Sequence, residues 1–406
     1  MLIEQYATYI GEGNVEEIKA VAEPLKGLKV LHVNSTKLGG GVSEILYRLI
    51  PLMRDLGIEA EWQVIKGDEE FFKVTKKIHN LLHMPGHERL TSEDIITYMR
   101  ITHENLSYID TSPYDIVFIH DPQPMGLIVN KLPHQKWVWR CHIDISTPDE
   151  ETWKFIEMFI NAYDAIVFHI AEFAKEGVKV PKFIIAPSID PFHDKNVELD
   201  RNFILSVLEK FGIDPEKPIL LQVSRFDRLK DPFGVIQAYK MVKKAYDCQL
   251  VLAGGYASDD PEGEEVYNEV MEEASKLKDV FILNLPPDSH YEINALQRSA
   301  TVVIQKSIRE GFGLVVTEAM WKEKPVVGSN VGGIRRQIVN GFTGYLVNSV
   351  EGTAYRIRQL LINSEMAKVM GRNAKERVRH TFLITRQLKD YLVLINYLIN
   401  SDHIQS

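Results

Sequence analysis

The feature that most constrains this chain is an alternation of short apolar segments with helical segments, which runs once and then starts again. In the first half the apolar segments lie at residues 28–34, 61–65, 115–120, 136–144, 165–169 and 182–190. In the second half they lie at 218–223, 249–254, 280–284 and 301–305, followed by 325–333 and 341–347. Near-continuous apolar strands with helices between them are typical of parallel sheets covered on both faces. We therefore expect an α/β protein with two successive doubly wound sheets.

The length of the chain and one proline-rich segment indicate two domains. At 406 residues a single hydrophobic core is not expected. Residues 214–218 carry two prolines between a helix and a strand, which is typical of a linker. We therefore predict a first domain over residues 1–214 and a second over 215–384. Expected helices end at Leu56, fall within 69–108 and span 151–161, 233–245, 262–277, 314–323 and 351–400.

Charge and cysteine content exclude some classes of protein. The net charge of −9 argues against a nucleic acid as the main partner, because phosphate backbones bind basic surfaces. Cys141 and Cys248 lie far apart, which favours a reducing compartment without a structural disulfide. Residues 1–11 lack the pattern of a signal peptide, and no apolar stretch approaches the roughly 20 residues that cross a bilayer. We expect a cytoplasmic protein that does not act at a membrane.

The segment 310–318 predicts a binding site for a phosphorylated sugar. It reads as a glycine loop between an apolar strand and a helix, so backbone N–H groups and the positive end of the helix dipole face an anion. Gly311 and Gly313 allow close approach of the backbone to a ligand. Glu310 and Glu318 are carboxylates, which accept hydrogen bonds from hydroxyl groups. This combination suits a sugar joined to a nucleotide by phosphates.

A second group of polar residues follows other predicted strands. Arg225 and Lys230 come after the strand at 218–223 and can hold a diphosphate, although an exposed basic turn would look the same. Ligands of doubly wound sheets gather at the carboxyl ends of the strands. The polar residues at such ends in the first half are Gly39, Gly40, Gly41, His120, Asp121, His142 and Asp144.

The motifs of the second half, taken in order, carry a family resemblance. Ser224, Arg225 and Lys230 form Ser-Arg-x-x-x-x-Lys, and Glu310 and Glu318 form Glu-x7-Glu. Pro-Val-Val-Gly-Ser-Asn-Val-Gly-Gly-Ile follows, and then Asn-Gly-Phe-Thr-Gly-Tyr-Leu-Val. With these motifs the chain resembles the retaining glycosyltransferases of family 4, which have the GT-B fold. Its first half is most similar to the trehalose-forming members from archaea and thermophiles.

The resemblance implies an activity and an arrangement. Two Rossmann-like domains would face each other with the active site in the cleft between them, and a last helix at 385–406 would cross back to the first domain. The reaction would join glucose from UDP-glucose or ADP-glucose to free glucose, giving α,α-trehalose, with the direction left open. The leaving phosphate would take the proton of the acceptor hydroxyl, as in the family's front-face route.

The resemblance also implies a role for each matching residue. Arg225 and Lys230 would hold the diphosphate and stabilise its charge as it leaves, and Glu310 would bind donor-sugar hydroxyls. Asp121 and His142 would contact acceptor and donor sugar as part of the catalytic set, with Asp144 as a further acceptor ligand. Glu318 would bind the ribose. Phosphate and donor would be lined by the backbone of Gly39, Gly40, Gly311, Phe312, Gly313, Leu314 and Val315.

The family's chemistry needs no tightly bound cofactor, because arginine and lysine stand in place of a metal at the diphosphate. A stimulatory effect of Mg²⁺ through the nucleotide stays open, as does a homodimer. The expected partners are nucleotide sugar, glucose and trehalose. Arg335 and Arg336 depart from the family pattern, which often has an acidic residue there, and this leaves the pocket for the base unassigned.

Several alternatives stay open at this stage. Asp121 can cap a turn, His142 can be a structural histidine at a strand end, and Asp144 fits slightly better as a helix cap than as a ligand. His79, His83 and His87 could suggest a metal site, but they lack a clear fourth ligand.

Other functions also stay open. Residues 71–82 form a basic amphipathic pattern, which is either an ordinary surface helix or a membrane-binding one that would suit a lipid acceptor. A glycan acceptor, a trehalose phosphorylase and a sugar-nucleotide-binding protein without turnover are further alternatives. A nicotinamide enzyme is disfavoured because Glu44 interrupts the G-x-G-x-x-G pattern.

Overall fold

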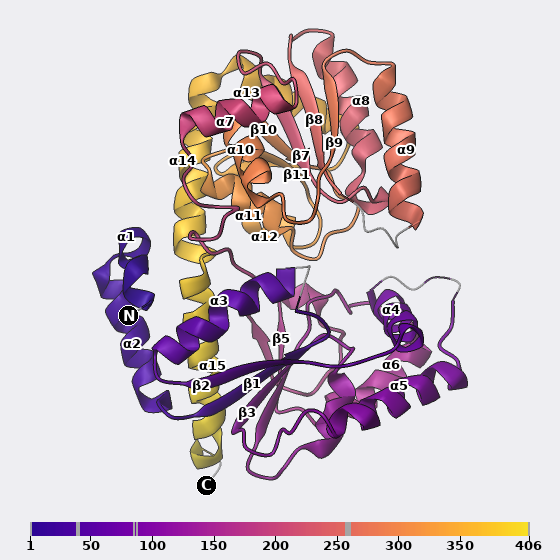
Figure 1. Cartoon of the computed structure of the whole chain (residues 1–406), viewed down its shortest axis with the longest axis vertical. Helices are drawn as coiled ribbons and strands as arrows, with labels where there is room; N and C mark the ends of the chain where they lie inside the picture. The colour runs from indigo at the N-terminus through magenta and orange to yellow at the C-terminus, as the bar shows by residue number, and fades with distance from the viewer. Residues whose placement is uncertain (1, 38–40, 84–85, 87, 256–260, 405–406) are drawn as a thin grey trace. The chain divides into compact units, whose positions relative to one another are not determined.

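The computed structural model describes residues 2–37, 41–83, 86, 88–255 and 261–404. The chain forms two compact units. Unit 1 contains residues 1–187 and 384–406, and unit 2 contains residues 188–383 (Figure 1).

Unit 1 is built on a six-stranded sheet in the order β2-β1-β3-β4-β5-β6, in which all neighbouring strands are parallel. Its strands are β1 (Lys29–Asn34), β2 (Glu59–Val64), β3 (Ile116–His120), β4 (Lys136–Arg140), β5 (Ala165–Phe168) and β6 (Lys182–Ile184). Strand order reverses between β1 and β3, and this is the switch point at which such sheets open a crevice.

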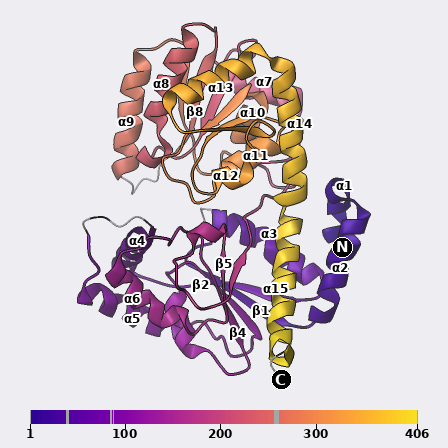
Figure 2. The ribbon, with the colours of Figure 1, turned by 180° about the vertical axis from the view of Figure 1, so that it is seen from behind.

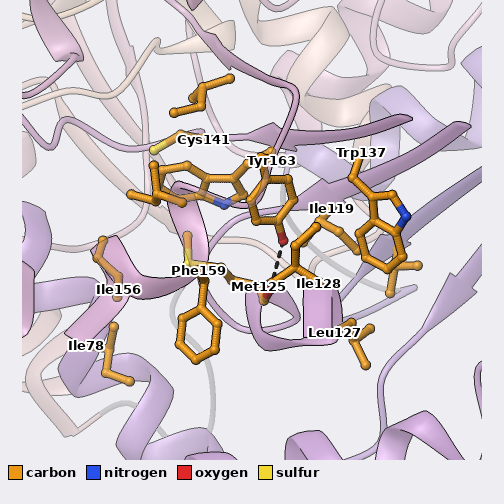
Figure 3. Close-up of a cluster of buried hydrophobic side chains, with 14 of the residues drawn as sticks. Ile78, Ile119, Met125, Leu127, Ile128, Trp137, Cys141, Ile156, Phe159 and Tyr163 are labelled. Carbon is orange, nitrogen blue, oxygen red and sulfur yellow. Dashed lines mark hydrogen bonds between the residues drawn. The ribbon is translucent and has the colours of Figure 1, made fainter. Parts of the chain in front are cut away.

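One face of this sheet carries the large apolar core of unit 1. It is covered by α4 (Glu69–His83), α5 (Ser92–Leu106) and α6 (Glu150–Ile160), with the short turn η3 (Met125–Asn130) beneath them. Figure 3 shows part of this core, where Trp137 of β4 lies among aliphatic side chains and the Tyr163 hydroxyl donates to the carbonyl of Met125 at 2.8 Å. Trp137 and Trp139 are fully buried and belong to this core.

The other face of the sheet is covered by segments from both ends of the chain. These are α2 (Glu12–Ala22), α3 (Gly41–Asp55) and the last helix α15 (Ile384–Ile404), with η1 (Ile3–Tyr6), α1 (Ala7–Ile10) and η2 (Glu23–Leu25) at the N-terminus. Asn396 of α15 donates to the carbonyl of Val21 at 2.9 Å, so the last helix is held against α2 (Figure 2). The short turn η4 (Ala171–Phe173) follows β5.

Unit 2 repeats the plan with the order β12-β11-β10-β7-β8-β9, again with all neighbouring strands parallel. Its strands are β7 (Ile219–Val223), β8 (Gln249–Gly254), β9 (Val280–Asn284), β10 (Val302–Gln305), β11 (Val326–Ser329) and β12 (Gly344–Val347). Read from β9, this is the strand order of a Rossmann sheet, and its switch point lies between β7 and β10.

The helices of unit 2 bury its sheet. One apolar core is formed with α8 (Pro232–Lys243), α9 (Pro261–Ser275) and α13 (Val350–Ile362), joined by the start of α14 (Ser364–Thr381). The remaining helices are α7 (Arg201–Lys210), the turn η5 (Arg228–Lys230), α10 (His290–Ser299), α11 (Leu314–Trp321) and α12 (Ile334–Gln337).

The two doubly wound sheets are confirmed, but three expected details are not. The first unit ends at Pro187 instead of residue 214, because α7 packs against α10 of unit 2. The fourth strand ends at Arg140 instead of residue 144, and the expected strand at 182–190 shrinks to the three residues of β6.

The amphipathic helix at 71–82 lies within α4 and packs on its own unit. Phe71, Ile78 and Leu82 of this helix are buried in the core, so its apolar face is already covered. Among the described residues, no helix is long and apolar enough to cross a membrane. Cys141 and Cys248 are both buried and unpaired, as expected.

Candidate active site

The site residues of unit 2 lie on the loops that follow β7 and β10, the two strands at the switch point. Arg225 and Lys230 come after β7, and Glu310 comes after β10. The amide N–H of Ile308 donates to the carbonyl of Leu229 at 2.7 Å and so joins the two loops. The structure therefore brings together residues that are 80 positions apart in the sequence.

The Glu310 carboxylate is held in place by three donors on one oxygen. Oε2 of Glu310 accepts hydrogen bonds from Lys230 Nζ at 2.7 Å, Ser307 Oγ at 3.0 Å and Gln305 Nε2 at 3.3 Å. The Glu310 side chain is only 9% exposed, so the carboxylate charge is compensated within the protein. All three bonds fall on Oε2, which leaves Oε1 as the oxygen for a ligand hydroxyl.

Ser307 and Gln305 are functional candidates that the sequence did not single out. Both lie within five residues before Glu310, and Gln305 is the last residue of β10. Polar residues at the end of a buried strand were the available signal. In the same way, Gln222 of β7 donates to the carbonyl of Lys230 at 2.7 Å and fixes the backbone beneath the lysine.

The start of α11 offers backbone donors to an anion. Gly313 precedes the helix with φ of 79°, a left-handed conformation that favours glycine, and it provides no side-chain cap. The first N–H groups of a helix have no acceptor within it, so those of Leu314 and Val315 are available to a phosphate. The side chain of Phe312 is buried, so only its backbone can face a ligand. Its carbonyl accepts a hydrogen bond from Gln337 Nε2 at 2.5 Å.

Close backbone packing supports the loop that carries Glu310. Gly332 has φ of 45°, and a Cβ atom there would lie 1.7 Å from the carbonyl oxygen of Glu310. A Cβ on Gly333 would lie 2.5 Å from Cα of Phe312. The segment Gly332–Gly333 can therefore lie against Glu310, Gly311 and Phe312 only because it lacks side chains.

The two remaining predicted residues of unit 2 differ in exposure. The Arg225 side chain is 70% exposed, and it contacts Asp227 at 3.5 Å. Glu318 lies inside α11, where it is buried with Gln297 Nε2 at 3.5 Å from Oε2. Arg335 and Arg336 are exposed on α12, in keeping with a position outside the core.

In unit 1, Asp121 fixes the loop that carries His142. Asp121 has φ of 64°, a left-handed conformation that aspartate tolerates better than most residues. Its Oδ1 accepts the backbone N–H of His142 at 2.8 Å. Burial raises the pKa of Asp121 to about 7, although the bond from His142 and the nearby Arg140 act to lower it. Asp121 therefore forms the turn that was the alternative to a site role, and it is also the residue for which the site role is predicted.

His142 is one of four imidazoles in contact across the carboxyl edge of the sheet. Nδ1 of His32 lies 3.0 Å from Nε2 of His120, and Nδ1 of His120 lies 3.0 Å from Nε2 of His142. Nδ1 of His142 in turn lies 3.1 Å from Nε2 of His169. His32 and His169 were missed because each reads as an ordinary residue of a buried strand.

Burial keeps these four rings neutral. It lowers the pKa of His32 to about 3 and the pKa values of His120, His142 and His169 well below the usual range. Arg140, which is fully buried beside them, lowers the pKa values of the last three further. His142 alone among the four keeps part of its surface exposed.

Two expectations in unit 1 need correction or fall outside the described residues. Asp144 does not cap the next helix, because Asp149 does so by accepting the N–H of Thr152 at 2.8 Å. Asp144 instead accepts the N–H of Ser146 at 2.9 Å in a turn of its own. Gly39 and Gly40, expected to line the phosphate, lie outside the described residues.

A metal site at these histidines (His79, His83 and His87) finds no support in the part of the chain that the structure describes. His79 and His83 have ring centroids 6.0 Å apart, and His87 lies outside the described residues. Within residues 2–37, 41–83, 86, 88–255 and 261–404, no group of three or more His, Cys, Asp or Glu side chains could hold a metal ion.

Comparison with known proteins identifies the class to which this fold and site belong. Residues 32–175 match the family model of the trehalose synthase N-terminal domain, and residues 206–377 match that of the glycosyl transferases group 1. Among solved structures, sucrose-phosphate synthase from Thermosynechococcus elongatus aligns with a TM-score of 0.70 at 17% identity over 93% of this chain and 100% of that one. Anabaena HepE in complex with UDP and glucose aligns with a TM-score of 0.69 at 16% identity over 91% and 99%. The protein is therefore a glycosyltransferase with the GT-B fold.

Curated relatives narrow this class. The trehalose synthase of Thermococcus litoralis is 49% identical over 97% of this chain and 96% of its own length. That of Rubrobacter xylanophilus is 44% identical over 98% and 97%. The chain belongs to the trehalose synthase family, which confirms the resemblance carried by the motifs. The roles of the individual site residues stay predictions.

Proposed function

We propose that this enzyme transfers glucose from a nucleoside-diphosphate glucose to free glucose and forms α,α-trehalose with retention of configuration. The observation that carries this proposal is the Lys230–Glu310 pair at 2.7 Å beside the uncapped start of α11. It provides a cation, a hydroxyl acceptor and backbone anion donors within one loop cluster. A diphosphate-linked sugar needs these three features together.

The chemistry is dominated by the charge on the departing diphosphate. The bond from the anomeric carbon to the phosphate oxygen breaks, the acceptor hydroxyl bonds to that carbon, and its proton passes to the leaving phosphate. Arg225, Lys230 and the first turn of α11 stabilise the negative charge. Preorganised groups of this kind supply a large part of catalysis, and one lost donor costs roughly 3–4 kcal/mol. Because two side-chain cations serve the diphosphate, we propose no tightly bound metal, and Mg²⁺ acts at most through the nucleotide.

We assign the acceptor side of the reaction to unit 1. Asp121 is half-buried and fixes His142, and its second carboxylate oxygen is left to accept a sugar hydroxyl. Asp144 is half-buried two residues beyond His142 and is proposed as a further acceptor ligand. Relatives named trehalose synthase at 44–49% identity support glucose as the acceptor, and the UDP and glucose bound by Anabaena HepE support a nucleotide-sugar donor.

The experiment that tests the proposal is product analysis by carbon NMR. The protein is incubated with UDP-glucose or ADP-glucose and unlabelled glucose, and a Glu310→Gln variant serves as the control. The symmetric signal of α,α-trehalose with release of nucleoside diphosphate in wild type alone is the expected result. Tight binding of the nucleotide sugar without trehalose would overturn glucose as acceptor and direct the search to lipid or glycan acceptors.

One alternative has a specific observation behind it. The trehalose phosphorylase of Pleurotus sajor-caju is 27% identical over 87% of this chain and 55% of its own length. A phosphorylase would split trehalose with inorganic phosphate and release glucose 1-phosphate. Incubation with trehalose and either phosphate or UDP separates the two reactions, and glucose 1-phosphate formed without nucleotide would replace the proposed function.

A further inference from the structure

Four imidazoles of unit 1 come from four neighbouring strands and make one continuous chain. His32 lies on β1, His120 ends β3, and His142 and His169 follow β4 and β5, in the spatial order of the sheet. Every contact joins Nδ1 of one ring to Nε2 of the next, at 3.0, 3.0 and 3.1 Å. These distances fit N–H···N hydrogen bonds.

The protons in such a chain must all point the same way. A neutral imidazole has one N–H and one lone pair, and each ring–ring contact needs one proton between its two nitrogens. If His32 carries its proton on Nδ1, then His120 must accept on Nε2 and carry its own proton on Nδ1, and the same holds along the chain. The position of the proton on His142 is therefore decided together with that on His32.

Both ends of the chain of rings are buried. The His32 ring is fully buried, stacked on Phe118 with centroids 4.6 Å apart and near Tyr391 at 6.0 Å. Nε2 of His32 at one end and Nδ1 of His169 at the other are buried nitrogens that face no further ring of this chain. Either direction of the protons places one N–H at a buried end, so the contacts require one tautomer that is common to all four rings.

We propose that His32, His120 and His169 are positioning residues for His142, which they hold in one ring orientation and in the one tautomer that all four rings share. The backbone N–H of His142, bonded to Asp121 at 2.8 Å, gives a third point of attachment. With both ring nitrogens engaged, a sugar hydroxyl reaches one of them only if a ring–ring bond opens. The effect on transfer rests on the proposed function, in which His142 contacts sugar, whereas the tautomer does not.

The tautomer is measured directly by nitrogen NMR of the full-length protein labelled with ¹⁵N-histidine. Single substitutions to glutamine at His32, His120, His142 and His169 assign the signals. We expect neutral rings at neutral pH, with the same nitrogen protonated in all four. A ring whose tautomer differs from that of the other three, or signals averaged between two tautomers, would overturn the proposal.

Two substitutions at His32 separate the hydrogen bond from the bulk of the ring. His32→Asn keeps an amide that can bond to His120 near the position of Nδ1, whereas His32→Leu removes that hydrogen bond. His32→Leu should lower kcat/KM for glucose by about tenfold through misplacement of His142, while His32→Asn should stay within about threefold of wild type. The His142 signals should change in the leucine variant and persist in the asparagine variant. Equal behaviour of the two variants in both measurements would contradict a positioning role.

Phe118→Leu is the matched control for damage to packing. It removes the ring that stacks on His32 from the neighbouring buried strand β3 but keeps all four imidazoles. We expect a lower Tm with unchanged His142 signals. If Phe118→Leu shifts those signals as His32→Leu does, loss of packing explains the effect and the proposal fails. If wild type transfers no sugar, the proposed function fails, and the tautomer of His142 still decides this inference.

Discussion

Nζ of Lys230 lies 2.7 Å from Oε2 of Glu310, and this contact connects the loops after β7 and β10 of unit 2. Neither side chain is much exposed, at 19% and 9%. The pair therefore exists before any donor arrives, and in the proposed function Lys230 would serve two negative groups, the carboxylate and a bound diphosphate. Such a dual contact should make Lys230 more sensitive to substitution than a lysine that only binds phosphate.

Lys230→Met should reduce both activity and stability. Loss of one cation at the diphosphate should lower kcat by on the order of a hundred- to thousandfold. The Glu310 carboxylate would keep Ser307 and Gln305 but lose its countercharge, which should cost roughly 3 kcal/mol of unfolding free energy. Steady-state kinetics and urea unfolding measure the two effects.

Lys240→Met is the matched control for Lys230→Met. Lys240 is paired with Glu273 but is 32% exposed and lies on α8. Its substitution should change kcat little and cost at most about 1 kcal/mol, as is usual for ion pairs near the surface. Normal turnover by Lys230→Met would refute the assignment of this lysine to the site.

Arg225→Ala should lower activity without lowering stability, whereas Lys230→Met should lower both. Because the Arg225 side chain is 70% exposed and its contact with Asp227 is long, its removal should leave Tm within error of wild type. If the guanidinium binds the diphosphate, kcat/KM for the nucleotide sugar should still fall by about a hundredfold or more. Arg228→Ala, which removes a surface contact to Glu265 and Glu269, is the control. Equal kinetics for the two variants would show that Arg225 is only part of an exposed basic turn and not of the site.

Much of the fold was predictable because buried parallel strands leave a strong local pattern. The apolar segments that became β1, β3, β7, β8 and β10 are continuous and bounded by polar residues, and burial on both faces demands that pattern. The domain boundary was less predictable. The proline pair near residue 214 resembles a linker, but the side chains of α7 pack on α10, and this long-range contact has no local sequence signal.

The candidate site also has one part that was predictable from the sequence and one part that was not. Arg225, Lys230 and Glu310 lie in motifs at strand ends, so their convergence followed from the topology of a doubly wound sheet. The partners that hold them did not follow, because a serine such as Ser307 or a histidine such as His32 gains its role only from a neighbour on another strand. His142 was predicted from its place at a strand end and from the family resemblance, and neither indicates that both of its ring nitrogens are engaged.

Gly332→Ala tests the backbone packing behind Glu310. The new Cβ would lie 1.7 Å from the Glu310 carbonyl oxygen, so one of the two segments must move. A shift of about 1 Å at Glu310 should lower kcat/KM for the donor by on the order of a hundredfold.

Gly341→Ala is the control for backbone strain at Gly332. Gly341 also has positive φ, at 80°, but a Cβ there would meet nothing within 4 Å. The control should lose about 1 kcal/mol of stability from strain and keep its activity. Similar activity in both variants would show that the Glu310 loop tolerates displacement.

The buried histidines predict a loss of stability in acid. For His32 the folded pKa is about 3 and the ordinary value 6.5, so the unfolded chain binds more protons between these values. Its contribution is fully present above pH 6.5 and is lost as pH falls toward 3, by roughly 1.4 kcal/mol per pH unit. His120, His142 and His169 act in the same direction, because their pKa values are also lowered.

Asp121 acts in the opposite direction, because its folded pKa of about 7 is raised. Its contribution is present below pH 3.8 and is lost as pH rises through 7, so it offsets about one of the histidines between these values. Urea unfolding between pH 4 and 8 should therefore show stability falling steeply below about pH 6. His32→Asn should reduce that slope by roughly 1.4 kcal/mol per pH unit, whereas substitution of the exposed His134 should leave it unchanged. An unchanged slope in His32→Asn would mean that His32 is not a buried neutral ring, as the chain of imidazoles requires.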